Sequence, residues 1–329
     1  MLSDGFNRRI DYLRLSVTDR CNLRCVYCMP ELAPRYSPHE DMLTDDEIVE
    51  LVSCFAQSGF AKIRITGGEP LVRPGLPTLI GRLSRVPGIS DIALSTNGVL
   101  LSDMAKELKK AGLKRVNISL DSLDPARFRR IARFGMLADV LKGIEASLDS
   151  GLTPVKINMV VARGMNADEI AAFAALTEAK PVHVRFIELM PMGETGFFTK
   201  ERWVPLQEMM VKAEPLEVIT QKDWPLGHGP ARYYRRPGAL GSIGFISALS
   251  CGFCAACNRV RLSSGGTLIP CLDATDGTDL RTPLRGGANR ERLKELIAAA
   301  IGGKPEGHDM NGRLTGSTMN PRFMCQIGG

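Results

Sequence analysis

The chain has 329 residues, which exceeds one average domain and favours either a large core with a smaller appendage or one large α/β barrel. Its net charge of +6, from 42 basic and 36 acidic side chains, favours anionic ligands weakly and does not by itself indicate nucleic-acid binding. No apolar run approaches the length of a membrane span, and the N-terminus lacks the apolar core of a secretory signal, so we expect a cytoplasmic protein.

Short β-branched runs alternate with amphipathic helical patterns as far as about residue 190. The candidate strands are 10–17, 61–66, 90–95, 114–119, 154–161 and 181–188. The helical patterns are 44–58, where Thr44 and Glu47 form a capping-box pattern, 75–86, 102–111, 136–150 and 166–178. Repeated strand–helix units predict a parallel sheet with helices outside it. Six units fall short of the eight in a closed barrel, so we predict an α/β fold built on a partial (β/α)6 TIM-like barrel.

The pattern weakens after about residue 192, where Gly and Pro become frequent and one clear helical pattern returns near 288–301. We therefore predict a barrel domain over 1–225 and a smaller, loop-rich C-terminal domain over 226–329. No G-x-x-x-x-G-K-[ST] motif is present, so nucleotide binding cannot depend on a P-loop.

Four polar motifs follow the carboxyl ends of the predicted strands, where an α/β barrel carries its functional residues. They are C-N-L-R-C-V-Y-C at 21–28, G-G-E-P at 67–70, S-T-N-G at 95–98 and S-L-D at 119–121. Each motif alone is also compatible with a simple turn. Their common position favours one functional face.

Basic and polar side chains recur with period two along the predicted strands. They are Arg14, Ser16 and Thr18 on the first strand, Lys62, Arg64 and Thr66 on the second, Lys156 and Asn158 on the fifth, and Arg185 on the sixth. Because parallel strands covered by helices have no solvated face, we expect these cations inside the barrel. Unpaired cations are costly to bury, so the barrel should hold a polyanion, and arginine forks suit phosphates.

The nine cysteines include two clusters, whose spacing indicates metal or redox chemistry rather than disulfides in a cytosolic protein. Zinc on Cys21, Cys25 and Cys28 would need a fourth ligand, for which His39 is the only close candidate. An iron–sulfur cluster on these three thiols would leave one iron open for chemistry.

The second cluster, C-G-F-C-A-A-C-N-R-V-R, supplies Cys254 and Cys257, and Cys271 follows fourteen residues after Cys257. Three cysteines again suffice for an iron–sulfur cluster. A zinc site with four cysteines, including Cys251, remains open.

C-x3-C-x2-C with an aromatic residue before the last cysteine, followed by G-G-E-P, resembles the radical S-adenosylmethionine (SAM) superfamily. The resemblance implies a 4Fe-4S cluster on Cys21, Cys25 and Cys28. It also implies that SAM binds the open iron and is cleaved to methionine and a 5′-deoxyadenosyl radical, which takes a hydrogen from the substrate.

The C-x2-C-x13-C spacing, N-R-x-R and the terminal Gly328-Gly329 are similar to the GTP 3′,8-cyclase family, and the similarity covers nearly the whole chain. This resemblance implies a SAM-dependent lyase that abstracts H3′ and converts GTP to (8S)-3′,8-cyclo-7,8-dihydroguanosine 5′-triphosphate, the first step of molybdenum cofactor (molybdopterin) biosynthesis. It further implies a second 4Fe-4S cluster that contacts GTP, a homodimer, a flavodoxin- or ferredoxin-like electron donor, and delivery of the product to cyclic pyranopterin monophosphate synthase. Nucleic acid and membranes are not implied as partners.

This resemblance also implies binding-site residues, which are assigned at the positions of this sequence that match the motifs of the family. The cysteines implied to hold the second cluster are Cys254, Cys257 and Cys271. The residues implied to bind SAM are Tyr27, Gly68, Ser119 and Met190. The residues implied to bind GTP are Arg14, Arg64, Ser95, Lys156, Arg259, Val260 and Arg261. Lys62 and Arg185 are possible further contacts with GTP, and Gly328 and Gly329 form a C-terminal tail. Ser95 stands where threonine is common and keeps the hydroxyl. Without the resemblance, Met190 could equally be a packing residue and Tyr27 a loop aromatic. The sequence assigns no role to Cys251, Cys54 or Cys325.

Two other functions are also compatible with the sequence. One is a different two-cluster radical SAM enzyme that modifies a peptide and needs no triphosphate site. The other is a nucleic-acid-binding zinc protein that uses R-R-P-G and N-R-V-R, although these stretches lack interleaved aromatic residues for stacking.

Overall fold

The computed structural model describes residues 2–32, 36–313 and 320–328. One 12-stranded sheet, in the order β12-β11-β10-β1-β2-β3-β4-β5-β6-β9-β8-β7, runs through the protein. Its central strands are β1 (Tyr12–Ser16), β2 (Lys62–Thr66), β3 (Asp91–Thr96), β4 (Arg115–Ser119), β5 (Val155–Val161) and β6 (Val182–Glu188), and they are parallel. These strands lie at the six predicted positions, and the predicted α/β class with a partial barrel is confirmed.

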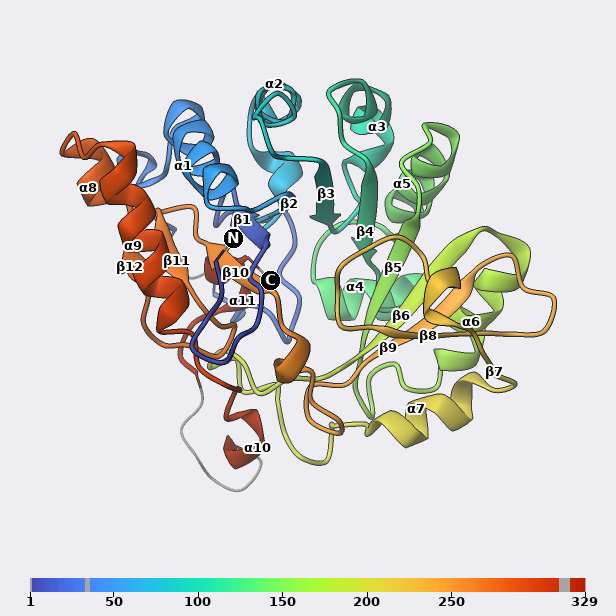
Figure 1. Cartoon of the computed structure of the whole chain (residues 1–329). Coiled ribbons are helices and arrows are strands. Elements are labelled where there is room, and N and C mark those ends of the chain that lie inside the picture. Colours follow the sequence, from blue (N-terminus) through green and yellow to red (C-terminus); the bar gives the residue numbers. More distant parts are fainter. Residues whose placement is uncertain (1, 33–35, 314–319, 329) are drawn as a thin grey trace.

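Helices cover the outside of this sheet (Figure 1). They are α1 (Asp45–Gln57), α2 (Leu76–Leu83), α3 (Leu101–Lys110), α4 (Pro125–Ala132), α5 (Leu137–Asp149) and α6 (Ile170–Ala179). The predicted capping box is present at α1, where Thr44 accepts a hydrogen bond from the Glu47 amide and the Glu47 side chain accepts one from the Thr44 amide. The sequence analysis did not predict α4, since its apolar residues form a narrow stripe between arginines.

The C-terminal part of the chain completes both sides of the barrel. β9 (Ser242–Ile246) pairs parallel with β6, and β10 (Arg259–Leu262) pairs parallel with β1. The remaining strands, β7 (Glu217–Val218), β8 (Arg232–Arg235), β11 (Thr267–Ile269) and β12 (Thr278–Asp279), are antiparallel additions at the two ends. Strands from both sides of residue 226 therefore share one sheet, and the division into 1–225 and 226–329 stays a prediction.

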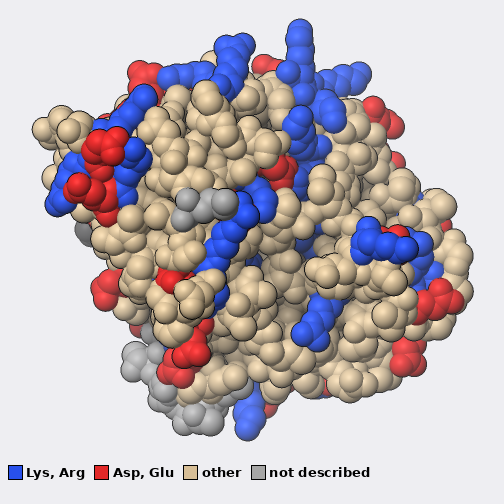
Figure 2. Space-filling model, viewed as in Figure 1, with Lys and Arg blue, Asp and Glu red and all other residues tan. Residues whose placement is uncertain are grey.

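The remaining helices are α7 (Leu206–Ala213), α8 (Arg281–Arg285), α9 (Arg290–Gly302), α10 (Met310–Arg313) and α11 (Met324–Ile327). α9 coincides with the pattern predicted near 288–301, and α7 was not predicted. Figure 2 shows acidic and basic side chains interspersed over α8 and α9, where Arg292 pairs with Glu295 and Lys294 with Glu291. None of the helices in the described part of the chain combines the length and apolarity that a membrane span requires.

The strands separate an apolar layer from a polar interior. On β1, Leu13 and Leu15 are fully buried in the main hydrophobic core, while Tyr12 and Arg14 line a cavity on the other face. The same alternation on β2 places Ile63 and Ile65 in the core and Arg64 and Thr66 in the cavity. Period-two alternation therefore delivers the polar side chains into the barrel.

Candidate active site

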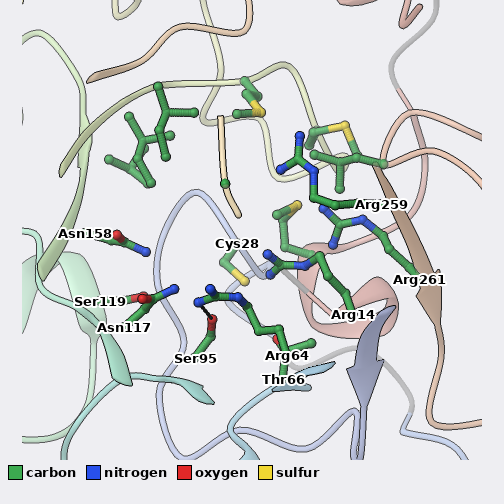
Figure 3. A pocket seen from close by; sticks show the side chains of 18 of the residues that line it. Arg14, Cys28, Arg64, Thr66, Ser95, Asn117, Ser119, Asn158, Arg259 and Arg261 are labelled. Carbon is green, nitrogen blue, oxygen red and sulfur yellow. Dashed lines mark hydrogen bonds between the residues drawn. The ribbon is translucent and has the colours of Figure 1, made fainter. Parts of the chain in front are cut away.

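A cavity of about 330 Å³ occupies the inside of the barrel at the carboxyl ends of the strands. Its wall contains both cysteine triplets and most of the residues assigned from the sequence (Figure 3). The predicted residues that line it are Arg14, Cys21, Cys25, Tyr27, Cys28, Arg64, Gly68, Ser95, Ser119, Arg185, Met190, Cys254, Cys257, Arg259, Arg261 and Cys271. Residues separated by up to 257 positions (14 to 271) thus meet in one site.

The first cysteine triplet lies on a loop with a compact turn. The amides of Cys28 and Met29 both donate to the carbonyl oxygen of Cys25, at 2.9 and 3.1 Å. Burial raises the pKa of the Cys21 thiol to about 11 and raises those of Cys25 and Cys28 well above the usual value. Because metal binding requires thiolates, loading this site must release protons.

The chemistry of this triplet fits an iron–sulfur cluster with one open iron, since three thiols line the cavity. The zinc alternative needed His39 as a fourth ligand, but His39 is exposed and is not in the cavity wall. Across residues 2–32, 36–313 and 320–328, no group of three His, Cys, Asp or Glu is arranged to hold a single metal ion.

The second triplet lies across the cavity on segments from the C-terminal part. Cys254 and Cys257 flank a short turn in which the Cys257 amide donates to the Cys254 carbonyl at 3.0 Å. Burial raises the pKa of the Cys257 thiol, but Arg259 and Lys304 more than offset it, and the net pKa is lowered. Cys251 is exposed and does not line the cavity, whereas Cys254, Cys257 and Cys271 do.

The G-G-E-P motif packs its backbone against the segment that leads into the first cysteine loop. The Gly68 amide donates to the Thr18 carbonyl at 2.7 Å, and the Glu69 amide donates to the Arg20 carbonyl at 2.8 Å. A Cβ atom at Gly68 would lie 2.3 Å from the Arg20 carbonyl oxygen, so only glycine allows this approach. The motif is therefore required for the shape of the site as well as for any contact with SAM.

The Glu69 carboxylate connects this motif to S-T-N-G. Its oxygens accept hydrogen bonds from the Thr96 hydroxyl at 2.7 Å and from the Asn97 amide at 2.6 Å. Burial raises the pKa of Glu69 to about 7, although these hydrogen bonds oppose the shift. The Asn97 side-chain amide also donates to Asn22 Oδ1 at 2.7 Å, so hydrogen bonds connect three of the four polar motifs.

The S-L-D motif connects to the first cysteine loop through Asp121. The Tyr27 hydroxyl donates to Asp121 Oδ2 at 2.6 Å, and the Val160 amide donates to Asp121 Oδ1 at 2.8 Å. Burial raises the pKa of Asp121 to about 6, against the effect of these hydrogen bonds. Asp121 thereby fixes the orientation of the aromatic ring between Cys25 and Cys28.

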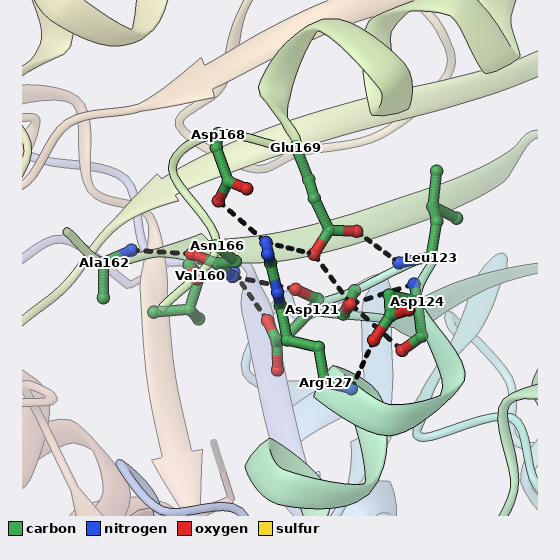
Figure 4. Close-up of polar contacts among 10 residues, drawn as sticks. Asp121, Leu123, Asp124, Arg127, Val160, Ala162, Asn166, Asp168 and Glu169 are labelled. Atoms are coloured by element: carbon green, nitrogen blue, oxygen red, sulfur yellow. Dashed lines mark hydrogen bonds and ion pairs between the residues drawn. The ribbon is translucent and has the colours of Figure 1, made fainter. Parts of the chain in front are cut away.

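A further hydrogen-bond network holds in place the segment after β4, which begins with Asp121 (Figure 4). The Asn166 side-chain amide donates to the carbonyl oxygens of Asp121 and Val160, each at 2.9 Å. Glu169 accepts from the Ser122 hydroxyl at 2.7 Å and from the Leu123 amide at 2.6 Å. Asn166 and Glu169 could not be identified from the sequence, because neither belongs to a motif or to a strand face.

A group of arginines from β1, β2 and β10 lines another part of the cavity wall. Arg14 stands in register with Arg64 on β2 and with Arg261 on β10, and Figure 3 shows Arg14, Arg259 and Arg261 directed toward one another. Burial, with Arg261 and Arg64 nearby, lowers the pKa of Arg14 well below its usual value. Burial and Arg259 lower the pKa of Arg261 to about 10. Such a group of like charges is stabilised by a bound polyanion, which agrees with the prediction from the strand pattern.

Three residues assigned to GTP lie outside the cavity wall. The Lys156 side-chain nitrogen donates to the carbonyl oxygens of Pro225 and Leu226, at 3.3 and 2.6 Å. Lys62 forms an ion pair with Asp11 at 2.8 Å. Val260 is buried in the core behind Arg259 and Arg261. These assignments stay predictions.

The C-terminal tail enters the barrel. Arg261 donates to the Gly328 carbonyl oxygen at 2.5 Å, and Arg14 donates to the same oxygen at 3.3 and 3.4 Å. Gly329 lies outside the described residues. Among the further residues of the cavity wall that could not be assigned to the site from the sequence are Tyr12, Asn117, Lys304, His308 and Cys325.

Two family models match the chain: Radical SAM superfamily over residues 15–177 and Molybdenum Cofactor Synthesis C over residues 182–310. A solved structure of SuiB from Streptococcus suis bound to S-adenosylmethionine has a TM-score of 0.59, with 14% identity, and covers 96% of this chain and 76% of that chain. This likeness shows the fold alone. Together with the cysteine loop, the fold and the first model define a radical SAM protein.

Relatives that align over the whole chain show to which family of radical SAM proteins it belongs. The chain is 51% identical over 332 residues to a GTP 3′,8-cyclase of Pelotomaculum thermopropionicum, covering 100% of both chains. It is 49% identical to a GTP 3′,8-cyclase of Heliobacterium modesticaldum, covering 99% of both chains. The chain belongs to the GTP 3′,8-cyclase family, and this confirms the resemblance seen in the sequence.

Proposed function

We propose that this protein is a GTP 3′,8-cyclase, which converts GTP to (8S)-3′,8-cyclo-7,8-dihydroguanosine 5′-triphosphate with SAM as cosubstrate. The reaction moves the ribose H3′ to the deoxyadenosyl group of SAM and joins C3′ to C8 of guanine, and one further electron and one proton then complete the 7,8-dihydro product. The observation that supports this proposal best is that both cysteine triplets and a group of arginines line the same cavity.

The two cysteine triplets would each hold a 4Fe-4S cluster. Cys21, Cys25 and Cys28 hold the cluster that binds SAM, and Cys254, Cys257 and Cys271 hold the second. When bound, the first cluster supplies the electron that cleaves SAM. The protein orients the two ligands within a partly enclosed cavity, which limits the access of water to a reactive radical.

The SAM side of the cavity is built from Tyr27, Gly68, Ser119 and Met190. Asp121 fixes the Tyr27 ring through its hydrogen bond, and the close packing at Gly68 fixes the adjacent backbone. Both features shape the site before ligands arrive, which is the main contribution of positioning residues.

The GTP side is built from Arg14, Arg64, Ser95, Arg259 and Arg261. The Arg64 guanidinium donates to the Tyr12 hydroxyl at 2.5 Å and to the Ser95 hydroxyl at 3.4 Å, so its plane is held in place. Arginine forks bind phosphate oxygens through paired hydrogen bonds. Arg185 lies in the same wall, while Lys156 and Lys62 would have to exchange their present partners to reach GTP.

The wider setting follows from this chemistry. We propose that the protein works in the cytoplasm as a homodimer, because thiol-ligated clusters need reducing conditions and members of this family are expected to pair. We also propose an external one-electron donor of the flavodoxin or ferredoxin class. The product would pass to cyclic pyranopterin monophosphate synthase in molybdenum cofactor biosynthesis.

A radical SAM enzyme that modifies a peptide is the strongest competing function. The arginine group disfavours it, because an ordinary peptide gives no polyanion to compensate these charges. Anaerobic reconstitution with iron and sulfide, followed by incubation with SAM, GTP and a chemical reductant, tests the proposal. Formation of an isomer of GTP that separates from GTP by chromatography, together with 5′-deoxyadenosine, supports it, and zinc without iron in the purified protein contradicts it.

A further inference from the structure

A basic surface with an apolar centre lies outside the cavity, at the C-terminal end of α4. It consists of exposed Arg129 and Arg130 in the last turn and of Phe134 and Met136 in the segment that follows, and we call it the α4 surface. Phe134 is 50% exposed and Met136 is 64% exposed. The stretch 125–136, P-A-R-F-R-R-I-A-R-F-G-M, contains no carboxylate.

The first cysteine loop lies directly beneath this surface. The Arg24 amide donates to the Ala132 carbonyl, and the Val26 amide donates to the Ile131 carbonyl, each at 3.0 Å. The Arg133 guanidinium donates to the Arg24 and Met29 carbonyl oxygens, each at 3.2 Å. The backbone of the cysteine loop is therefore bonded to the residues that carry the α4 surface.

The apolar part of the surface also contacts this loop. A Cβ atom at Gly135 would lie 2.8 Å from Leu23 Cδ2, so the backbone between Phe134 and Met136 packs directly on a residue between two cluster cysteines. Leu23 therefore contacts this segment and also lines the cavity together with the three cysteines, while the Val26 amide bonds to Ile131. Leu23 thus connects the segment that carries the α4 surface to the part of the cavity wall that contains the cysteine thiols.

The arginines of α4 differ in whether their charge is compensated. Arg127 pairs with Asp168 at 2.7 Å and with Glu169 at 2.8 Å and belongs to the network that supports Asp121 (Figure 4). Within the described part of the chain, neither Arg129 nor Arg130 forms an ion pair. The Arg129 guanidinium lies 5.7 Å from the centre of the Phe134 ring. Two exposed and uncompensated charges thus border two exposed apolar side chains.

A small pocket extends the surface beside Arg130. It measures about 210 Å³, and Arg130, Arg163, Arg202 and Val26 are among its lining residues. Arg163 is paired with Glu208 at 2.6 Å. Arg202 lies 4.4 Å from the centre of the Phe197 ring, and this ring lies 6.4 Å from that of Tyr27. The pocket and the cavity therefore both adjoin the cysteine loop, the pocket at Val26 and the cavity at Tyr27.

We propose that the α4 surface docks an acidic one-electron carrier protein of the flavodoxin or ferredoxin class, which reduces the cluster on Cys21, Cys25 and Cys28. This inference rests on the proposed function, because only a cluster at these cysteines requires an electron. One electron leaves the reduced carrier, which becomes oxidised by one electron, and no bond forms or breaks at the surface. An apolar centre beside uncompensated arginines complements an acidic partner, and encounters between redox partners use small interfaces.

The test compares two charge-reversed double variants. Arg129→Glu with Arg130→Glu changes the last turn of α4, and Lys109→Glu with Lys110→Glu makes the same change in the last turn of α3, where both lysines are exposed. The two variants carry equal net charge and alter a helix C-terminus in the same way. Both are prepared as reconstituted protein, and their iron content is compared with that of the unchanged protein.

The first readout is binding of a purified flavodoxin, measured by calorimetry at low and high salt. We expect the α4 variant to bind at least tenfold more weakly at low salt and to lose most of the salt dependence, while the α3 variant binds like the unchanged protein. The second readout is 5′-deoxyadenosine formation driven either by reduced flavodoxin or by dithionite. We expect the α4 variant to lose the flavodoxin-driven rate and to keep the dithionite-driven rate.

Several outcomes overturn the assignment. Unchanged flavodoxin binding in the α4 variant excludes the surface, and so does an equal loss of the flavodoxin- and dithionite-driven rates, which places the defect in the cysteine loop. A change of oligomeric state without loss of flavodoxin binding identifies the surface as a contact between copies of this chain. If the unchanged protein is inactive with dithionite, the proposed function fails, independently of the surface.

Discussion

The guanidinium of Arg261 donates a hydrogen bond to the carbonyl oxygen of Gly328 at 2.5 Å, which joins a strand of the sheet to the C-terminal tail. Gly328 has a φ of +71°, and a Cβ atom there would lie 2.8 Å from Thr66 Cγ2. The tail is therefore inserted between the ends of β1 and β2 and reaches the arginines that we assign to GTP.

Replacing Gly328 with alanine should displace this tail. The left-handed conformation costs an alanine about 1–2 kcal/mol, and the contact with Thr66 adds to this cost. With the tail displaced, Arg261 loses its partner, and we expect the KM for GTP to rise about tenfold while SAM affinity stays within about twofold. Steady-state kinetics and SAM calorimetry measure the two effects.

Gly238→Ala is the matched control for this prediction. Gly238 has a φ of +72°, and no atom lies within 4 Å of the position that a Cβ would take there, so the substitution carries the conformational cost without the contact. The control should lose stability and keep the KM for GTP. If both variants change KM alike, the tail has no specific role in GTP binding.

Replacing Arg261 with alanine should weaken GTP binding much more than SAM binding. A hydrogen bond to a charged group contributes about 1.5–3 kcal/mol, or about ten- to a hundredfold in affinity. Binding of each ligand is measured by calorimetry, with the exposed Arg292→Ala on α9 as a control. Equal losses for the two ligands would place Arg261 outside the GTP site.

Cys251 should be dispensable for the second cluster, because it is exposed and outside the cavity wall. Cys251→Ala should keep the iron and sulfide content of the unchanged protein, whereas Cys254→Ala should lose about half of it, since one of two clusters is affected. Elemental analysis and electron paramagnetic resonance of anaerobically reconstituted protein check this. Loss of the cluster in the Cys251 variant alone would show that the assigned ligand set is wrong.

GTP binding should take up a proton at Lys156. Burial and the neighbouring arginines lower the pKa of Lys156 to about 5, so this side chain is neutral near pH 7 before the triphosphate arrives. A triphosphate within reach favours the ammonium form and raises the pKa, so up to one proton is bound per GTP. Because binding takes up a proton, GTP affinity should fall by up to about tenfold per pH unit between pH 6 and 9.

Calorimetry in buffers of different ionisation enthalpy measures this proton uptake directly. Lys156→Met should remove it, and His183→Gln serves as a control, because burial lowers the pKa of His183 to about 4 and this group lies on β6 beside Lys156. Absence of proton uptake in the unchanged protein would show that Lys156 keeps its carbonyl partners when GTP binds.

The central strands could be predicted from the sequence, because buried parallel strands are short β-branched runs between helices. β10 could not, since its four residues pair with β1, from which they are 247 positions distant (12 to 259). Contacts between residues that are distant in the sequence were equally unpredictable inside the site. The side of β5 that carries Lys156 follows from period two, but its contact with Leu226 depends on a loop that no local pattern places there.

The presence of the cysteine triplets and the arginine group in one site could be predicted from motifs and strand alternation, whereas the residues that hold these side chains in place could not. The hydrogen bond between Tyr27 and Asp121 joins two motifs that the sequence shows only as separate strand ends. Asn166 and Glu169 support Asp121 from the segment before α6, and a polar residue in such a segment is ordinarily solvated.

Transfer of deuterium from GTP to 5′-deoxyadenosine tests the proposed activity most directly. Reconstituted protein is incubated anaerobically with SAM, dithionite and GTP that carries deuterium at C3′, and both nucleoside products are analysed by mass spectrometry. We predict 5′-deoxyadenosine with one deuterium and a cyclised triphosphate that has lost it from C3′. Unlabelled 5′-deoxyadenosine with unchanged GTP would contradict the assignment of GTP as the substrate.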